Sequence, residues 1–222
     1  MVLFHFGEDM NYSHIIWDFN GTILNDVQTG IDAVNVLLER YGKKKIDSVD
    51  EYRAAFGFPV IDYYDRIGLE RENFTKYAPE WVAEYNLREA YAPIFDGIID
   101  LMEYFRGNNC PQYLLSATES QMLKSQVKRL GIGNYFEEII GQSSIEAHGK
   151  IDAALNWLQK NKPEKALFIG DSLHDFEVAQ AMNIDCVLLT WGHQSKEKLK
   201  TSGCRVFDTA ADIQKAFENG EI

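Results

Sequence analysis

The stretch HIIWDFNGTILND, from His14 to Asp26, decides the fold of this 222-residue chain. Its apolar run IIW has the composition of a buried strand, and this run delivers Asp18 to a Gly-Thr turn. A strand that ends in a carboxylate followed by a tight turn is a common way to present a catalytic acid. Two residues later, where such a site would benefit from a second carboxylate, the chain has Asn20.

Further short β-rich runs follow this stretch, and most of them end in polar or glycine residues. Segments with helical periodicity alternate with these runs, which is typical of a parallel sheet covered by helices on both faces. We expect strands at 14–19, 112–116, 165–170, 186–190 and 204–207, and helices at 98–105, 120–130, 151–159 and 176–182.

Residues 25–94 interrupt this alternation, because their segments are all helix-like and contain no convincing strand. An all-helical insertion directly after the first strand would lie over the carboxyl edge of the sheet, where α/β folds bind their ligands. The sequence therefore predicts an α/β core domain formed by residues 1–24 and 95–222, with a helical cap domain at 25–94 that has the position of a lid.

Composition excludes several classes of partner. The net charge of −12 argues against nucleic acid and anionic membranes, because both require basic patches. No apolar run approaches the length of a membrane span, and the segment MVLFHFGEDM is too short and too acidic for a signal peptide. We therefore expect a cytoplasmic monomer or homodimer without nucleic-acid or membrane partners. Its cysteines, Cys110, Cys186 and Cys204, lack paired spacing and are expected to be buried free thiols.

Candidate catalytic residues follow the predicted strand ends. Ser116 ends the second strand, Lys150 opens a helix, and Asp171 and Asp175 follow a later strand. Because parallel strands end at one edge of a sheet, these side chains can converge on Asp18. The set suits phosphoryl transfer, in which a carboxylate attacks phosphorus, a hydroxyl and an ammonium orient the phosphoryl oxygens, and clustered acids bind Mg²⁺.

Four segments, DFNGTILND, LLSAT, GK and IGDSLHDFEVAQAMNI, resemble the four motifs of the haloacid-dehalogenase superfamily of hydrolases. The resemblance covers almost the whole chain and is closest to the phosphoglycolate-phosphatase-like branch. It implies a Rossmann-like parallel sheet covered by helices, with an inserted helical cap of the C1 type. It also implies a Mg²⁺-dependent phosphatase that forms an aspartyl-phosphate while it hydrolyses a small phosphorylated metabolite.

The resemblance also implies a role for each matched residue. Asp18 would be the nucleophile, and it would share the metal ion with the backbone carbonyl of Asn20, with Asp171 and with Asp175. Arg53 lies in a cap segment similar to one that dips towards the active site, so it is a candidate partner for a carboxylate or a second phosphate. The residues expected to contact the phosphate or the rest of the substrate are Ser116, Lys150, Gly21, Thr22, Ala117 and Arg53.

Asn20 departs from the family pattern, in which an Asp at this position protonates the leaving oxygen and then activates water. An amide can neither donate nor accept a proton at useful pH, and the loss of general acid–base catalysis costs about 10²–10⁴-fold in rate. We therefore expect an attenuated phosphatase. The alternative is a protein that binds phosphate and metal, or is slowly phosphorylated, in a binding or regulatory role.

Three further explanations for Asn20 remain open. A nearby residue could replace the missing base, and the candidates are His148, His174, His193 and Glu146. Carbon–phosphorus chemistry would require a cap lysine, but Val60 stands where that lysine would align. Finally, the Asn-Gly pair is prone to deamidation, and an Asp-to-Asn substitution made to trap a complex would also leave an Asn here.

Overall fold

The structure is a computed structural model, and it describes residues 11–142 and 150–222. The segment at 1–10, which we expected not to be a signal peptide, lies outside the described residues. His148 and Glu146, two of the candidate bases, lie outside them as well. Within the described part of the chain, no helix combines the length and apolar character needed to cross a membrane.

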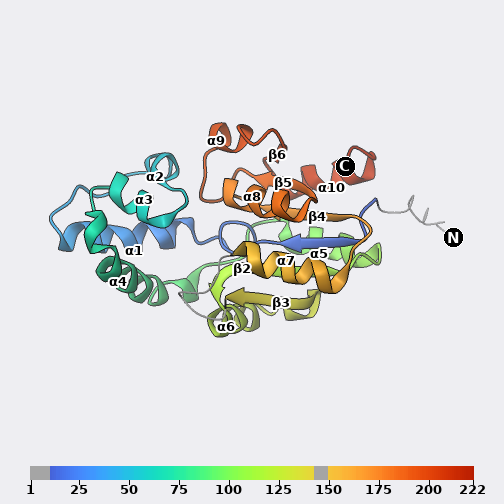
Figure 1. The fold of residues 1–222 in the computed structure, drawn as a ribbon, viewed down its shortest axis with the longest axis horizontal. Coiled ribbons are helices and arrows are strands. Elements are labelled where there is room, and N and C mark those ends of the chain that lie inside the picture. The colour runs from blue at the N-terminus through green and yellow to red at the C-terminus, as the bar shows by residue number, and fades with distance from the viewer. Residues whose placement is uncertain (1–10, 143–149) are drawn as a thin grey trace.

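A six-stranded parallel sheet forms the centre of the molecule, with the strand order β3-β2-β1-β4-β5-β6 (Figure 1). This order reverses direction between β1 and β4, so a topological switch point lies at their carboxyl ends. The Rossmann-like α/β fold expected from the sequence is thereby confirmed. The strands are β1 (His14–Trp17), β2 (Gln112–Glu119), β3 (Phe136–Gln142), β4 (Ala166–Gly170), β5 (Asp185–Leu189) and β6 (Arg205–Phe207).

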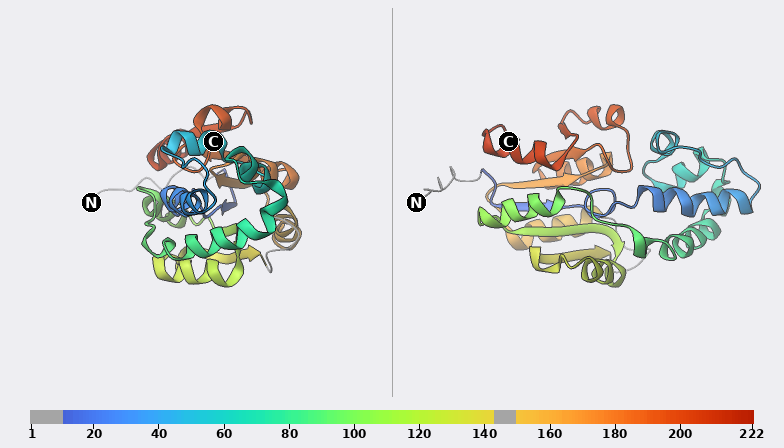
Figure 2. Two further views of the ribbon diagram at one scale, coloured as in Figure 1. Left: turned by 90° about the vertical axis from the view of Figure 1, so that its left-hand side faces the viewer. Right: turned by 180° about the vertical axis from the view of Figure 1, so that it is seen from behind.

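Helices cover both faces of the sheet, because successive strand side chains point to opposite sides. Trp17 packs with α5, α6 and α10 on one face, whereas Ile16 packs with α7 and α8 on the other. Figure 1 shows α7 and α8 in front of the sheet, and the rear view in Figure 2 shows α5 and α10. The core helices are α5 (Ile98–Gly107), α6 (Ser120–Leu130), α7 (Lys150–Asn161), α8 (Leu173–Met182), α9 (Lys196–Lys200) and α10 (Ala210–Glu218).

The helical insertion lies beyond the carboxyl ends of the strands, towards which the arrowheads of β1 and β3 point (Figure 1). It has a hydrophobic core of its own, separate from the two clusters against the sheet. Two backbone hydrogen bonds join its entrance to its exit, from Asn25 N to Pro93 O and from Phe95 N to Ile23 O. Its elements are α1 (Val27–Arg40), α2 (Val49–Ala55), α3 (Val60–Arg66), α4 (Phe74–Asn86) and the 3₁₀ turns η1 (Arg71–Asn73) and η2 (Glu89–Tyr91).

The two largest differences from the expected element boundaries are three residues each, at the end of β2 and at the start of α8. The strand β2 continues past Ser116 to Glu119, with an irregular register against β3. The helix α8 begins at Leu173 rather than at residue 176, because Ser172 and Asp175 form a capping box at its first turn. The short helix α9 and the terminal helix α10 were not expected from periodicity at all.

The cysteines are all free, as expected, but only Cys110 is buried; Cys186 and Cys204 are partly exposed. Cys186 lies on β5, and Cys204 directly precedes the adjacent strand β6. A hydrogen bond from the Cys186 thiol, supported by the hydroxyl of Ser202, outweighs burial and lowers the pKa of Cys204 to about 7. Burial raises the pKa of Cys110 to about 12.

Alkylation should therefore select Cys204. Because the thiolate is the reactive form, iodoacetamide at pH 7.5 is expected to modify Cys204 well before Cys110. The rate should rise with pH up to about 7 and then level off, whereas an ordinary thiol keeps gaining reactivity through its pKa of about 8.5. Peptide mass spectrometry, with Cys204→Ser as the control, measures the selectivity for Cys204 and the pH dependence of its alkylation rate. A rate that still climbs steeply above pH 8 would contradict the lowered pKa.

Candidate active site

Two adjacent strands carry the central carboxylates of the site. Asp18 directly follows β1, and Asp171 directly follows β4, so both lie at the switch point of the sheet. Both are almost fully buried. The hydroxyl of Thr22 lies 3.2 Å from Oδ2 of Asp18 and 3.4 Å from Oδ1 of Asp171. The two carboxylates, which are 153 positions apart in the chain, therefore form one site.

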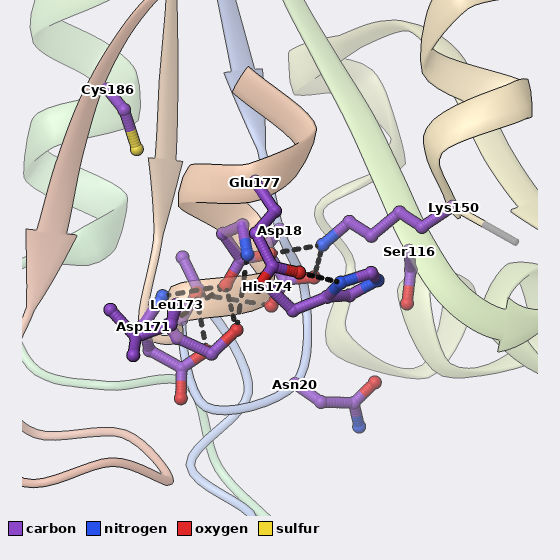
Figure 3. A network of polar contacts seen from close by, with 12 residues as sticks. Asp18, Asn20, Ser116, Lys150, Asp171, Leu173, His174, Glu177 and Cys186 are labelled. Atoms are coloured by element: carbon purple, nitrogen blue, oxygen red, sulfur yellow. Dashed lines mark hydrogen bonds and ion pairs between the residues drawn. The ribbon is translucent and has the colours of Figure 1, made fainter. Parts of the chain in front are cut away.

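Lys150 brings a positive charge between the carboxylates. It is the first described residue of α7, it is buried, and its Nζ donates to Oδ1 of Asp18 and, at 2.5 Å, to Oδ1 of Asp175 (Figure 3). Burial alone would lower the pKa of this ammonium, but Asp175 and Asp18 outweigh burial and raise it. Lys150 is therefore a fixed cation at the base of the site.

Asp175 has structural contacts as well as its contact with Lys150. Its Oδ2 accepts hydrogen bonds from the backbone amides of Asp171 (3.1 Å) and Ser172 (3.0 Å) and from the Ser172 hydroxyl (2.7 Å). Burial would raise the pKa of Asp175, but the Lys150 charge and these donors lower it. Asp175 thus caps α8, as an isolated Asp near a helix start often does. It also holds Lys150 in place, so it belongs to the site as well.

The carboxylates of Asp18, Asp171 and Asp175 lie so close together that a bound cation would stabilise them. Burial raises the pKa of Asp18 to about 6, against the opposing charge of Lys150. Burial raises the pKa of Asp171 to about 8, against the opposing charge of His193. Carboxylate oxygens of Asp18, Asp171 and Asp175 all lie within 4.8 Å of one another. A donor set made only of oxygens at this spacing fits a hard divalent cation such as Mg²⁺.

Two glycines make room for Asp171. Gly21 has a φ of +73°, and a Cβ at this position would lie 2.4 Å from Oδ2 of Asp171. A Cβ on Gly192 would lie 2.1 Å from the same oxygen. Both positions therefore require glycine, since any side chain would displace the carboxylate. The sequence suggested a turn at Gly21 but contained no signal for the role of Gly192.

A cavity of about 390 Å³ lies between these carboxylates and the cap. Asp18, Asn20, Ser116 and Ala117 line it from the core, together with Lys150, Asp171 and Asp175. The hydroxyl oxygen of Ser116 accepts a hydrogen bond from Thr118 N at 3.1 Å, and no acceptor among the described residues is recorded for its own hydrogen. Most of the residues that were expected to contact a ligand are therefore brought together.

Gly21, Thr22 and Arg53 are the exceptions. Gly21 and Thr22 pack beneath the carboxylates and do not line the cavity, and the Gly21 amide already donates to Asp26 Oδ1 at 2.8 Å. Arg53 is bound to the backbone carbonyls of Gly192 (2.8 Å) and Trp191 (2.5 Å). Its guanidinium joins the cap to the core, so the structure does not bring Arg53 to the substrate position that we expected.

The amide of Asn20 is fully engaged. Its Nδ2 donates to Asp26 Oδ2 at 2.8 Å and to the Tyr85 hydroxyl at 2.9 Å, and its Oδ1 accepts from the Thr118 hydroxyl at 2.7 Å. Figure 3 shows the side chain directed away from the cluster around Asp18. An amide satisfies two acceptors and one donor here, and a carboxylate could not, because it has no N–H groups.

Asp26 and His193 form a buried pair beneath Asn20. His193 Nε2 lies 3.2 Å from Asp26 Oδ1, Nδ1 lies 2.9 Å from the Tyr52 hydroxyl, and the backbone amide donates to Asp171 Oδ2 at 2.6 Å. Burial would lower the pKa of His193, but Asp26 and the other carboxylates raise it to about 9. Burial would likewise raise the pKa of Asp26, but the imidazolium lowers it. The two residues are therefore an ion pair at neutral pH.

Asp26 is a site residue that the sequence pattern did not indicate. Asp26 precedes α1 in the position of a helix cap, but its side chain makes no capping hydrogen bond and instead turns into the site. An Asp before a helix is normally a helix cap, so the sequence alone does not distinguish a capping Asp from an Asp that points into the site. Of the candidate bases that the structure describes, His174 lies 3.2 Å from Glu177 and packs on Phe58, whereas His193 is held by Asp26.

Comparison with known proteins tests the predicted family. A profile of the haloacid dehalogenase-like hydrolases matches residues 15–189. Phosphoglycolate phosphatase 1 of Pseudomonas aeruginosa is 23% identical over 189 residues, which cover 81% of this chain and 70% of that protein. Tyrosine-protein kinase PtkA of Mycobacterium tuberculosis is 24% identical over 208 residues, which cover 92% and 71%.

A solved structure agrees with the sequence matches. The haloacid dehalogenase-like hydrolase SP0104 of Streptococcus pneumoniae has a TM-score of 0.80 and 25% identity to this chain, and the match covers 92% of this chain and 98% of that one. The resemblance inferred from the four motifs is thereby confirmed. The chain belongs to the haloacid dehalogenase-like hydrolase family.

Proposed function

We propose that this protein is a Mg²⁺-dependent phosphatase that hydrolyses a small phosphomonoester through an aspartyl-phosphate on Asp18. The observation that carries the proposal is the convergence of Asp18, Lys150 and Asp171 beside one cavity at the carboxyl edge of the sheet. Membership of a hydrolase family supports it, as does the similarity to proteins named phosphoglycolate phosphatase.

Asp18, Ser116 and Lys150 would carry out the covalent step. A carboxylate oxygen of Asp18 bonds to phosphorus while the ester oxygen departs with its electron pair, and water then hydrolyses the acyl phosphate to release phosphate and restore Asp18. The Ser116 hydroxyl and the Lys150 ammonium would orient the phosphoryl oxygens and offset their charge. Without these donors, the acidic site would repel a phosphate group.

Asp18, Asp171 and the backbone carbonyl of Asn20 would hold Mg²⁺. Asp175 would support them from behind, because one of its oxygens caps α8 and the other binds Lys150. When bound, the cation would neutralise carboxylates that are otherwise crowded and would offset the charge of the phosphoryl group. A hard, oxygen-seeking ion is the group that this donor set fits.

Hydrolysis of p-nitrophenyl phosphate in the presence of MgCl₂ tests the proposal directly. Turnover that requires the metal and disappears with EDTA is the expected result. A second candidate function, phosphate or metal binding with little turnover, is favoured by one observation, the engaged amide of Asn20. Binding of a phosphate analogue without any turnover would support that second function and would overturn the phosphatase.

Metal binding should also stabilise the fold. Saturating Mg²⁺ is expected to raise the melting temperature of the EDTA-treated protein by about 5–10 °C, because a ligand at 100 times its Kd contributes about 2.7 kcal/mol. Asp171→Asn should lose this shift, whereas Glu197→Gln, an exposed acid on α9, should keep it. Differential scanning fluorimetry measures both, and an equal shift in the two variants would place the cation elsewhere.

A further inference from the structure

The cap side of the cavity is mainly aromatic and aliphatic. The segment from α2 to α3 contributes Phe56, Phe58 and Tyr63, and α4 contributes Trp81 and Val82; we call these five residues the cap wall. Phe58 is 42% exposed and Val82 is 37% exposed, so the wall presents apolar surface to solvent at the cavity. Exposed apolar surface in a concave site is typical of a ligand-binding position.

Among the described residues, the lining of this cavity holds few cations that could bind a charged leaving group. Lys150 is the only lysine or arginine among the described residues that line it, and its ammonium is already shared by Asp18 and Asp175. His193 also lines the cavity, where Asp26 neutralises its imidazolium. A substrate that carries a carboxylate beyond its phosphate, such as phosphoglycolate, would therefore meet rings and carboxylates, with no unpaired lysine or arginine among the described lining residues.

Asn20 adds an independent constraint on the leaving group. It lines the cavity, but its amide cannot protonate a departing oxygen. A phenol, with a pKa of about 10, leaves readily as its anion. An aliphatic alcohol, whose acidity is close to that of water at about 15.7, is a far poorer leaving group without a proton donor. A site without a general acid at residue 20 is therefore suited to esters of phenols.

We propose that the substrates of this site are aryl phosphates, the phosphate monoesters of phenols, with the aryl ring against the cap wall. This inference rests on the proposed phosphatase function. As Asp18 bonds to phosphorus, the bond from phosphorus to the aryl oxygen breaks, and the phenolate leaves with the electron pair. Water then cleaves the acyl phosphate, and the phenolate takes up a solvent proton, so that one water is consumed for each phenol and phosphate released.

Three substrates separate the contributions of the ring and of the leaving group. Phenyl phosphate has the ring and a good leaving group, benzyl phosphate has the ring and a poor one, and phosphoglycolate has neither the ring nor an uncharged body. We expect kcat/KM to fall in that order, with phenyl phosphate ahead of benzyl phosphate by at least about 10²-fold. Phosphoglycolate turned over as well as phenyl phosphate would overturn the inference and leave the phosphatase intact. No turnover of any of the three would overturn the phosphatase itself.

Variants of the cap wall test the position of the ring. Trp81→Ala should raise KM for phenyl phosphate about tenfold more than KM for phosphoglycolate, because it removes apolar contact with the ring. The matched control is Tyr91→Ala, at a position that is 87% exposed and outside the cavity. Equal effects of the two substitutions on phenyl phosphate would overturn the placement of the ring.

A gained charge gives a second, independent readout. Val82→Arg puts a guanidinium at the partly exposed edge of the cap wall, where arginine is compatible with the helix. It should raise kcat/KM for phosphoglycolate relative to phenyl phosphate about tenfold, since it supplies the missing cation. Leu87→Arg, at a position that is 70% exposed and outside the cavity, should leave the ratio unchanged. The same ratio in both arginine variants and in the wild type would contradict the proposal.

Discussion

Asp18→Asn should reduce phosphatase turnover by about 10⁴-fold or more, a loss of the size seen when a covalent nucleophile is removed. The substitution leaves the shape of the side chain unchanged, and the amide oxygen can still accept a hydrogen bond from Lys150. What it removes is the carboxylate that bonds to phosphorus. Steady-state hydrolysis of phenyl phosphate measures the loss, and mass spectrometry of quenched wild-type enzyme should detect the aspartyl-phosphate on the peptide that contains Asp18.

The stability of the same variant separates a chemical loss from an unfolded protein. Burial raises the pKa of Asp18 to about 6, so at pH 8 the folded state holds a carboxylate in surroundings that disfavour its charge. An acid whose pKa is higher in the folded state loses stability as the pH rises from about 3.9 to about 6, and at pH 8 this loss is complete. Asn carries no charge and avoids the loss, so the metal-free variant should melt at or above the wild-type temperature at pH 8. If folded Asp18→Asn protein turned over within about tenfold of the wild-type rate, Asp18 would not be the nucleophile.

The core of the fold and the central residues of the site could be predicted because their signals are local. Asp18, Ser116 and Asp171 lie in or directly after apolar runs that form parallel strands, and such strands end at one edge. The convergence of these side chains therefore follows from topology alone. Lys150 opens α7 after β3, a strand that the residue pattern did not indicate, so the position of Lys150 rested on the family resemblance.

The cap side of the site could not be predicted, because it depends on how helices pack over the sheet. Nothing in the sequence relates Tyr85 on α4 to Asn20, which is 65 positions away, although their side chains are in contact. The role of Arg53 could not be predicted either. An arginine that binds a substrate and an arginine that binds two backbone carbonyls have the same sequence pattern. The limits of the cap domain, 25–94, also stay a prediction.

Asn20→Asp should raise kcat/KM for benzyl phosphate by about 10²–10⁴-fold and kcat/KM for phenyl phosphate much less, because kcat/KM reports on the step in which the leaving group departs. The new carboxyl group would lie beside Asp26 Oδ2, which now accepts from the Asn20 amide at 2.8 Å. Two carboxyl groups that share a site hold a proton between them, since both cannot ionise at that distance. A carboxyl group that stays protonated at neutral pH is the general acid that the wild-type cavity lacks. Rates for the two substrates, measured on protein whose residue 20 has been verified by mass, give the answer.

The gain in rate should be accompanied by a pH-dependent loss of stability. The folded variant retains a proton that the unfolded chain releases above a pKa of about 3.9, so its free energy of unfolding relative to wild type should fall as the pH rises above about 4. The loss should be about 1.4 kcal/mol for each pH unit over which the folded variant keeps this proton, or about 4 kcal/mol by pH 7. Urea unfolding at pH 5 and pH 8 measures the difference, and a constant difference would show that Asp26 does not interact with residue 20.

These two effects together explain why Asn20 suits this chain. The buried acid that would compete with an Asp at residue 20 is Asp26, and Asp26 is itself needed because it neutralises His193, whose backbone amide binds Asp171. An amide at residue 20 relieves the repulsion and hydrogen-bonds the pair to the cap through Tyr85. An equal gain in kcat/KM for phenyl and benzyl phosphates in Asn20→Asp would contradict this account. It would mean that the amide at residue 20 limits the rate by some means other than the missing protonation of the leaving group.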